Sequence, residues 1–71
     1  MNGSMPRKDI HIVPEGNDWL VESTSYGSEL SFDTQAEALD YGRRVAKEEH
    51  ADLFIHGHDG EIRAADSYAE D

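Results

Sequence analysis

Four histidines are the residues of this chain with the most specific chemistry. His56 and His58 are one residue apart and Asp59 follows them, so they offer two imidazoles and a carboxylate near one predicted turn, with His11 on another strand. The two histidines, however, straddle Gly57, and no fourth ligand stands at a defined spacing. We therefore assign no metal-binding residues. We expect a non-enzymatic protein, and the one exception that we keep open is an unrecognised metal-assisted site at these histidines.

Other patterns typical of catalytic or cofactor sites are missing from the sequence. The chain has no Cys, which excludes thiolate catalysis, thiolate metal sites and disulfides. Its 16 Asp and Glu residues show no spacing that singles out an acid/base pair. Residues 32–34, Phe-Asp-Thr, place a carboxylate at the start of the predicted helix, where a phosphate-binding loop has glycines. The sequence therefore predicts no enzyme, no catalytic residues and no cofactor.

Acidic residues dominate the charge, because 16 Asp and Glu against six Lys and Arg give a formal charge of −10. Phosphate groups repel such a chain, since nucleic-acid binding depends on Lys and Arg that displace counterions. We therefore expect no direct nucleic-acid binding and no membrane binding. The predicted helix carries three basic residues on one side, Arg43, Arg44 and Lys47. We interpret this side as a solvated face, on which Asp40 and Glu48 neutralise the positive charge. With no apolar run of membrane-spanning length and no leader segment, we expect a cytoplasmic protein.

Alternating apolar and polar residues predict four strands, at about residues 8–13, 19–25, 52–56 and 61–68. Pro14 is expected to end the first strand, because proline donates no hydrogen bond to a sheet. Residues 15–18 predict a hairpin turn, and Asp59-Gly60 predicts a second tight turn in which both φ angles are positive. Residues 25–31 are mostly polar, and we expect a loop or an irregular edge there.

One helix of about 15 residues is predicted between residues 35 and 49. Thr34 and Glu37 fit a capping box, in which the Thr hydroxyl accepts from the Glu N–H. Small and apolar residues recur at spacings of three and four, as on a helix face turned to a core: Ala38, Leu39, Gly42, Val45 and Ala46. Gly42 costs about 1 kcal/mol relative to Ala, so we expect it to allow a close approach to the sheet, over Trp19. His50 tolerates a left-handed backbone and is expected to end the helix.

The order ββαββ predicts an α+β fold, a four-stranded antiparallel sheet with one helix packed on one face. The predicted core consists of apolar residues from all five elements: Ile10, Ile12, Trp19, Val21, Leu39, Val45, Leu53, Ile55 and Ile62. We expect residues 1–4 to be a disordered extension or a remnant of cloning, residues 5–68 to form a single small domain, and residues 69–71 to be a frayed acidic tail.

Several short blocks follow one another along the chain, and they include Ile12-Val13-Pro14, Trp19-Leu20-Val21, Phe32 to Ala38, Gly42-Arg43, Ala51 to His56, Asp59 to Arg63 and Asp66-Ser67-Tyr68. Together they resemble the small prokaryotic family known as domain of unknown function 2188, over roughly residues 5–68. The resemblance implies no assigned enzymatic activity. Members commonly end in Ser-Tyr-Gly-Asn-Asp-Pro, whereas this chain continues from Tyr68 as Ala-Glu-Asp, so no role is carried over for that ending.

The predicted sheet has one face that the helix does not cover, and such a face stays in water unless something docks on it. Counting along the strands puts four candidate interface residues there: Val13, Leu20, Phe54 and His56. We therefore expect a non-enzymatic domain that acts through protein–protein contacts, with a second copy (a homodimer) or another protein as partner. The alternative is an acidic inhibitor or nucleic-acid mimic that occupies a basic groove. Solubility, salt adaptation and mimicry all remain open explanations of the acidity.

Overall fold

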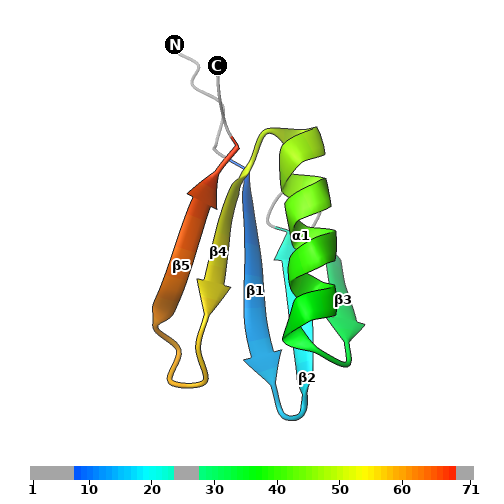
Figure 1. Cartoon of the computed structure of the whole chain (residues 1–71), viewed down its shortest axis with the longest axis vertical. Coiled ribbons are helices and arrows are strands. Elements are labelled where there is room, and N and C mark those ends of the chain that lie inside the picture. Colours follow the sequence, from blue (N-terminus) through cyan, green and yellow to red (C-terminus); the bar gives the residue numbers. More distant parts are fainter. Residues whose placement is uncertain (1–7, 24–27, 69–71) are drawn as a thin grey trace.

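One helix lies across one face of a five-stranded sheet (Figure 1). The computed structural model describes residues 8–23 and 28–68. The expected N-terminal extension (1–4) and acidic tail (69–71) lie outside the described residues. The elements follow in the order β1 (Asp9–Glu15), β2 (Asp18–Ser23), β3 (Ser28–Phe32), α1 (Gln35–Glu49), β4 (Asp52–His56) and β5 (Ile62–Ser67).

The sheet has the strand order β3-β2-β1-β4-β5 and is mixed. Its β1–β2, β2–β3 and β4–β5 pairs are antiparallel, whereas β1 and β4 are parallel. The predicted α+β class with one helix on one face is confirmed, but the four-stranded antiparallel sheet is wrong. The helix returns the chain to the end of the sheet where β1 begins, so β4 runs in the same direction as β1.

The missed strand is β3, in a segment that was expected to be a loop or an irregular edge. It pairs with β2, with Phe32 opposite Trp19 at one end and Ser28 opposite Ser23 at the other, and it forms one edge of the sheet. An edge strand needs only one neighbour and little apolar surface, and Leu30 is indeed 45% exposed. Its sequence alternates only briefly, with Leu30 and Phe32 separated by Ser31, so the apolar signal is shorter than in the better-covered strands.

The first hairpin corrects a second expectation, because β1 continues through Pro14 to Glu15. Pro14 lies opposite Trp19, next to the Glu15–Asp18 pair that closes the turn. On the other side of β1, the pairing with β4 ends at Ile12, so the missing N–H of proline breaks no bond there. Within the turn, Gly16 has a φ of 62°, and no positive φ occurs at the residue after it, a pattern typical of a type II′ hairpin.

Both ends of α1 lie where the sequence predicts them. At the start, Thr34 Oγ1 accepts a hydrogen bond of 3.1 Å from the Glu37 N–H. At the end, His50 adopts the left-handed conformation (φ 55°, ψ 51°) and its N–H donates to the Ala46 carbonyl. Gly42 lies against the sheet as expected, but its neighbours are Ile12 and Leu53 rather than Trp19. A Cβ at Gly42 would lie 2.9 Å from Ile12 Cδ1 and 3.3 Å from Leu53 Cδ1.

The core lies between α1 and the sheet, and among the described residues it consists of eight buried apolar ones: Ile10, Ile12, Val21, Ala38, Ala46, Ala51, Leu53 and Ile55. Trp19, Leu39 and Val45 pack against this core while partly exposed. The assignment of Ile62 to the core is wrong, since its side chain is 55% exposed. A register shift between Ile55 and His56 pairs Ile62 with His56, which turns Ile62 away from the helix.

The helix covers β1 to β4 unequally and, among the described residues, makes no contact with β5 (Figure 1). All six residues of β5 are accordingly exposed. In the part of the chain that the structure describes, no helix is both long enough and apolar enough to span a membrane.

Candidate functional site: the open face of the sheet

Strand pairing defines the side chains on the face of the sheet opposite α1. Ile10, Ile12, Leu53 and Ile55 are buried towards the helix, so the residues that alternate with them point to the other side. We call this side the open face, and its central side chains are His11, Val13, Leu20, Phe54, His56, Ile62 and Ala65. The four candidate interface residues from the sequence, Val13, Leu20, Phe54 and His56, therefore all lie on one surface.

The apolar side chains of the open face form a strip across four strands, which His11 and His56 interrupt. Val13 of β1 is paired with Leu20 of β2, and Phe54 of β4 is paired with Ala65 of β5. Ile62 extends the strip beside His56. Its members on the inner strands are half-buried by their neighbours within the sheet, and those on β5 are exposed. A partner on this face would therefore cover apolar surface that the fold itself leaves uncovered.

Two histidines lie at the centre of the open face. His11 is on the central strand β1, and its Nδ1 lies 2.9 Å from Nε2 of His56 on β4, a hydrogen-bond distance. The His11 ring also stacks on Phe54, with 5.2 Å between centroids and 24° between planes. The three rings therefore form one cluster, held by the parallel pairing of β1 with β4.

The sequence grouped His58, Asp59 and, on another strand, His11 with His56. In the structure His11 lies within hydrogen-bond distance of His56, whereas Asp59 bonds to Glu61 and Arg63. His58 packs edge-on against Trp19, with 5.5 Å between ring centroids. The parallel β1–β4 register, which brings in His11, depends on the whole fold and has no local sequence signal. Among the described residues, no group of three or more His, Asp or Glu is arranged to hold a metal ion.

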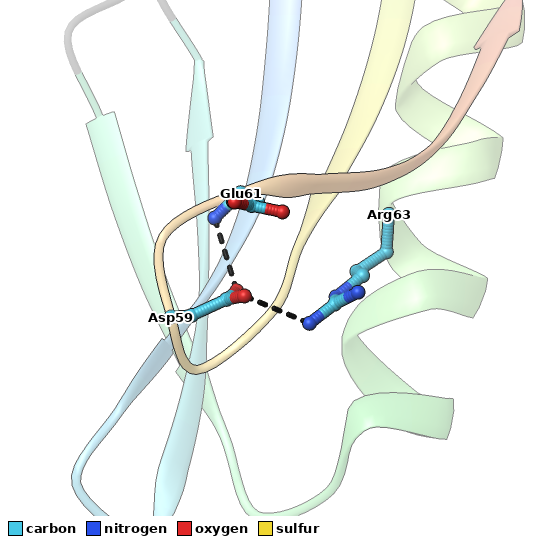
Figure 2. Close-up of polar contacts among 3 residues, drawn as sticks. All are labelled: Asp59, Glu61 and Arg63. Carbon is cyan, nitrogen blue, oxygen red and sulfur yellow. Dashed lines mark hydrogen bonds and ion pairs between the residues drawn. The ribbon is translucent and has the colours of Figure 1, made fainter.

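Asp59 organises the β4–β5 turn instead (Figure 2). Its Oδ1 accepts a hydrogen bond of 3.1 Å from the Glu61 N–H, and its Oδ2 accepts one of 2.8 Å from Arg63 Nη2. The prediction that both Asp59 and Gly60 have positive φ is wrong, because only Gly60 does, at 85°. The Gly60 N–H donates to the Gly57 carbonyl, so the turn is longer than a two-residue one. This longer turn accompanies the register shift that moves Ile62 onto the open face.

An open hollow of about 460 Å³ adjoins the strip at the other end of β4 and β5. It is lined by Phe54 and Ala65, together with Asp52, Asp66 and Ser67. The Ser67 hydroxyl donates to Asp52 Oδ1 over 2.7 Å at its edge. The hollow is a shallow, open depression in which the apolar side chains Phe54 and Ala65 lie beside polar ones.

The outer face of α1 carries the basic trio that the sequence places in solvent. Arg44 forms an ion pair of 3.6 Å with Asp40 one turn earlier, and both side chains are exposed. Lys47 Nζ lies 5.9 Å from the centre of the Tyr68 ring. The predicted pairing of Arg44 with Asp40 is confirmed, and such exposed pairs contribute little to stability.

The fold and this face define a class: a small α+β domain whose mixed sheet is covered on one side by a single helix and open on the other. The model of one protein family, described as "Uncharacterized protein conserved in bacteria (DUF2188)", matches residues 10–68. The chain belongs to this bacterial family, which confirms the resemblance seen in the sequence. Neither a curated protein nor a solved structure matches the chain.

Proposed function

We propose that this protein is a non-enzymatic domain that acts through protein–protein contacts and self-associates through its open face. The observation that supports this proposal is the apolar strip from Leu20 to Ile62, which crosses the middle of the sheet opposite the helix. Burial of apolar surface stabilises association by roughly 25 cal/mol per Å². The cytoplasm stays the expected location, since a chain without Cys gives no sign of an oxidising compartment.

The size of the open face sets the expected strength of the dimer. Five strands about 4.8 Å apart, each five to seven residues long at about 3.3 Å per residue, cover roughly 24 by 19 Å. Two such faces fall at the small end of protein interfaces, which bury below about 1,200 Å² in total and belong to weak or transient complexes. We therefore propose a weak, reversible homodimer.

Net charge opposes this dimer and gives it a characteristic salt response. Each chain carries a formal charge of −10, so two chains repel each other at low ionic strength. Salt screens the repulsion, and self-association through an apolar strip should strengthen or persist as salt is added.

The alternative proposal, an acidic inhibitor or nucleic-acid mimic, is favoured by one further observation. Carboxylates flank the apolar strip: Glu22 lies beside His11 on the open face, and it is paired with Glu29 on β3. A basic partner would pair with these charges, and its binding would weaken steeply with added salt. The sign of the salt dependence therefore separates the two proposals.

The test of self-association uses sedimentation of the parent chain and of a Leu20→Ser/Phe54→Ser double variant. The parent should be in monomer–dimer equilibrium at high concentration, and the double variant should be monomeric with an unchanged circular dichroism spectrum. Leu30→Ser is the matched control, because Leu30 is an apolar residue of the sheet that is exposed but is paired with Val21 on the helix side.

Leu30→Ser should associate as the parent does. A parent that stays monomeric at millimolar concentration contradicts the proposal, and so does a double variant that dimerises normally. An unfolded double variant would show instead that Leu20 and Phe54 are needed for the fold.

A further inference from the structure

We propose that His11 and His56 are a chelating pair for a divalent transition-metal ion of the zinc type, and that a second copy of the chain completes the site with its own pair. This inference rests on the proposed function, because it requires two open faces to meet. The result would be a metal-bridged dimer with four imidazole ligands around one ion.

The distance between the two imidazole nitrogens suits this role. His11 Nδ1 and His56 Nε2 lie 2.9 Å apart. Imidazole nitrogens bind zinc at about 2.0–2.1 Å, so two of them on one ion lie roughly 2.9 Å apart at a right angle and about 3.4 Å apart at the tetrahedral angle. An ion can therefore replace the proton shared by the two rings if the nitrogens move by about half an ångström or less and each ring turns so that its lone pair points to the ion.

Both rings are already held in place by the fold. His11 is on the central strand and stacks on Phe54, which restricts its rotation. His56 ends β4, directly before the turn that Asp59 and Gly60 organise. The rings stand on adjacent parallel strands, so the backbone ladder sets the separation of their attachment points. Ligands ordered before binding lose little conformational entropy when the ion binds.

One chain alone leaves the coordination incomplete. Zinc in structural sites has four ligands, and the described residues contain no cluster of three metal-binding side chains that includes this pair. Phe54, which stacks on His11, offers no donor, and the Glu22 carboxylate, paired with His11 across the β1–β2 ladder, forms no three-ligand group with the two histidines among the described residues. The missing ligands must therefore come from outside the chain.

A second copy on the open face brings those ligands to the right place. Dimers with a two-fold axis bring the same patch of both chains together. The histidine pair lies on the central strand β1 and its neighbour β4, so a two-fold axis through the pair sets the two pairs opposite each other. Sheets packed face to face are about 10 Å apart, a spacing at which side chains from both sides meet midway. A cation between chains of charge −10 each also reduces their repulsion.

The test measures zinc binding and association together on chelator-treated protein. Calorimetric titration with ZnCl₂ should give one ion per two chains. Sedimentation should show dimerisation strengthened about tenfold when free zinc is about ten times its dissociation constant. Replacement of zinc by Co²⁺ should give the intense visible absorption of a tetrahedral ion, which reports the coordination geometry of the shared site separately from the sedimentation measurement.

Three variants separate this pair from the other histidines. His11→Gln and His56→Gln should each abolish the zinc-dependent dimer and the cobalt absorption while keeping the circular dichroism of the parent. His58→Gln is the matched control, because His58 contacts Trp19 and should leave the zinc response intact.

Each other outcome overturns the inference in a distinguishable way. One zinc ion on each monomer would show that the site is not shared between copies. A zinc response that survives in His11→Gln or His56→Gln would place the ion elsewhere. A dimer that forms without zinc and ignores it would overturn the metal site but leave the proposed function standing. Absence of a dimer with or without zinc would contradict both.

Discussion

The two faces of the sheet arise from the same alternation of residues, yet they differ in what covers them. Ile12 is fully buried beneath α1, whereas Val13, the next residue of the same strand, is half-buried on the open face. On the helix side, Ala38, Gly42 and Ala46 are small enough to let α1 lie close to the sheet. The helix face therefore holds the fold together, and the apolar residues of the open face remain free to contact a partner.

The largest expected effect is on the buried face. Ile12→Ala removes a fully buried side chain that touches the helix at Gly42, and we expect a loss of about 2–5 kcal/mol in the free energy of unfolding. Such a loss is most of the stability of a domain this small. Val13→Ala is the control on the open face and should cost much less in urea denaturation. Equal losses would remove the distinction between the two faces.

Gly42→Leu should cost about 1–3 kcal/mol by overpacking against Ile12 and Leu53, although leucine favours helices more than glycine does. Ala36→Leu, in the exposed first turn of the same helix, should leave the free energy of unfolding nearly unchanged. A Gly42→Leu variant that melts at or above the parent's temperature would mean that α1 does not lie close to the sheet at this point.

Thr34→Ala tests how firmly the covering helix is held at its start. It removes the hydrogen bond from the Glu37 N–H to the Thr hydroxyl and should cost roughly 0.5–2 kcal/mol, visible as several degrees in the melting temperature. Thr34→Ser keeps a hydroxyl and should restore most of the loss. Identical melting of the parent and the Thr34→Ala variant would show that this bond does not support the helix.

Added salt should produce the smallest change, and it acts on the whole surface rather than on one face. Folding gathers a net charge of −10 into a small volume, so screening should raise the melting temperature between low salt and about 0.5 M. Thermal melts over this range, at a concentration where the chain is monomeric, measure the effect. A steady fall would mean that exposed ion pairs such as Arg63–Asp59 outweigh the repulsion.

Local features of the structure could be predicted from the sequence, and those that depend on distant strands could not. Thr34 and His50 act within one helical turn, so both ends of α1 were predicted correctly. Alternation is likewise local, and it assigned Leu20 and Phe54 to the correct face. The strand β3 was missed because an edge strand needs few apolar residues.

The direct contact between His11 and His56 could not be predicted for the same physical reason, although the sequence named both as potential ligands. His11 and His56 are 45 positions apart, and only the parallel β1–β4 register brings them together. Sequence proximity favoured His58, which the turn directs to Trp19 instead. The register shift that moves Ile62 to the open face depends in the same way on how β5 pairs with β4.

The most direct test of self-association through the open face is a dilution series followed by amide NMR. If two copies meet there, concentration-dependent shifts should gather at Val13, Leu20 and Phe54, and the amides of the exposed side of α1, such as Arg44, should stay constant. Shifts confined to α1, or spectra unchanged up to millimolar concentration, would contradict the account.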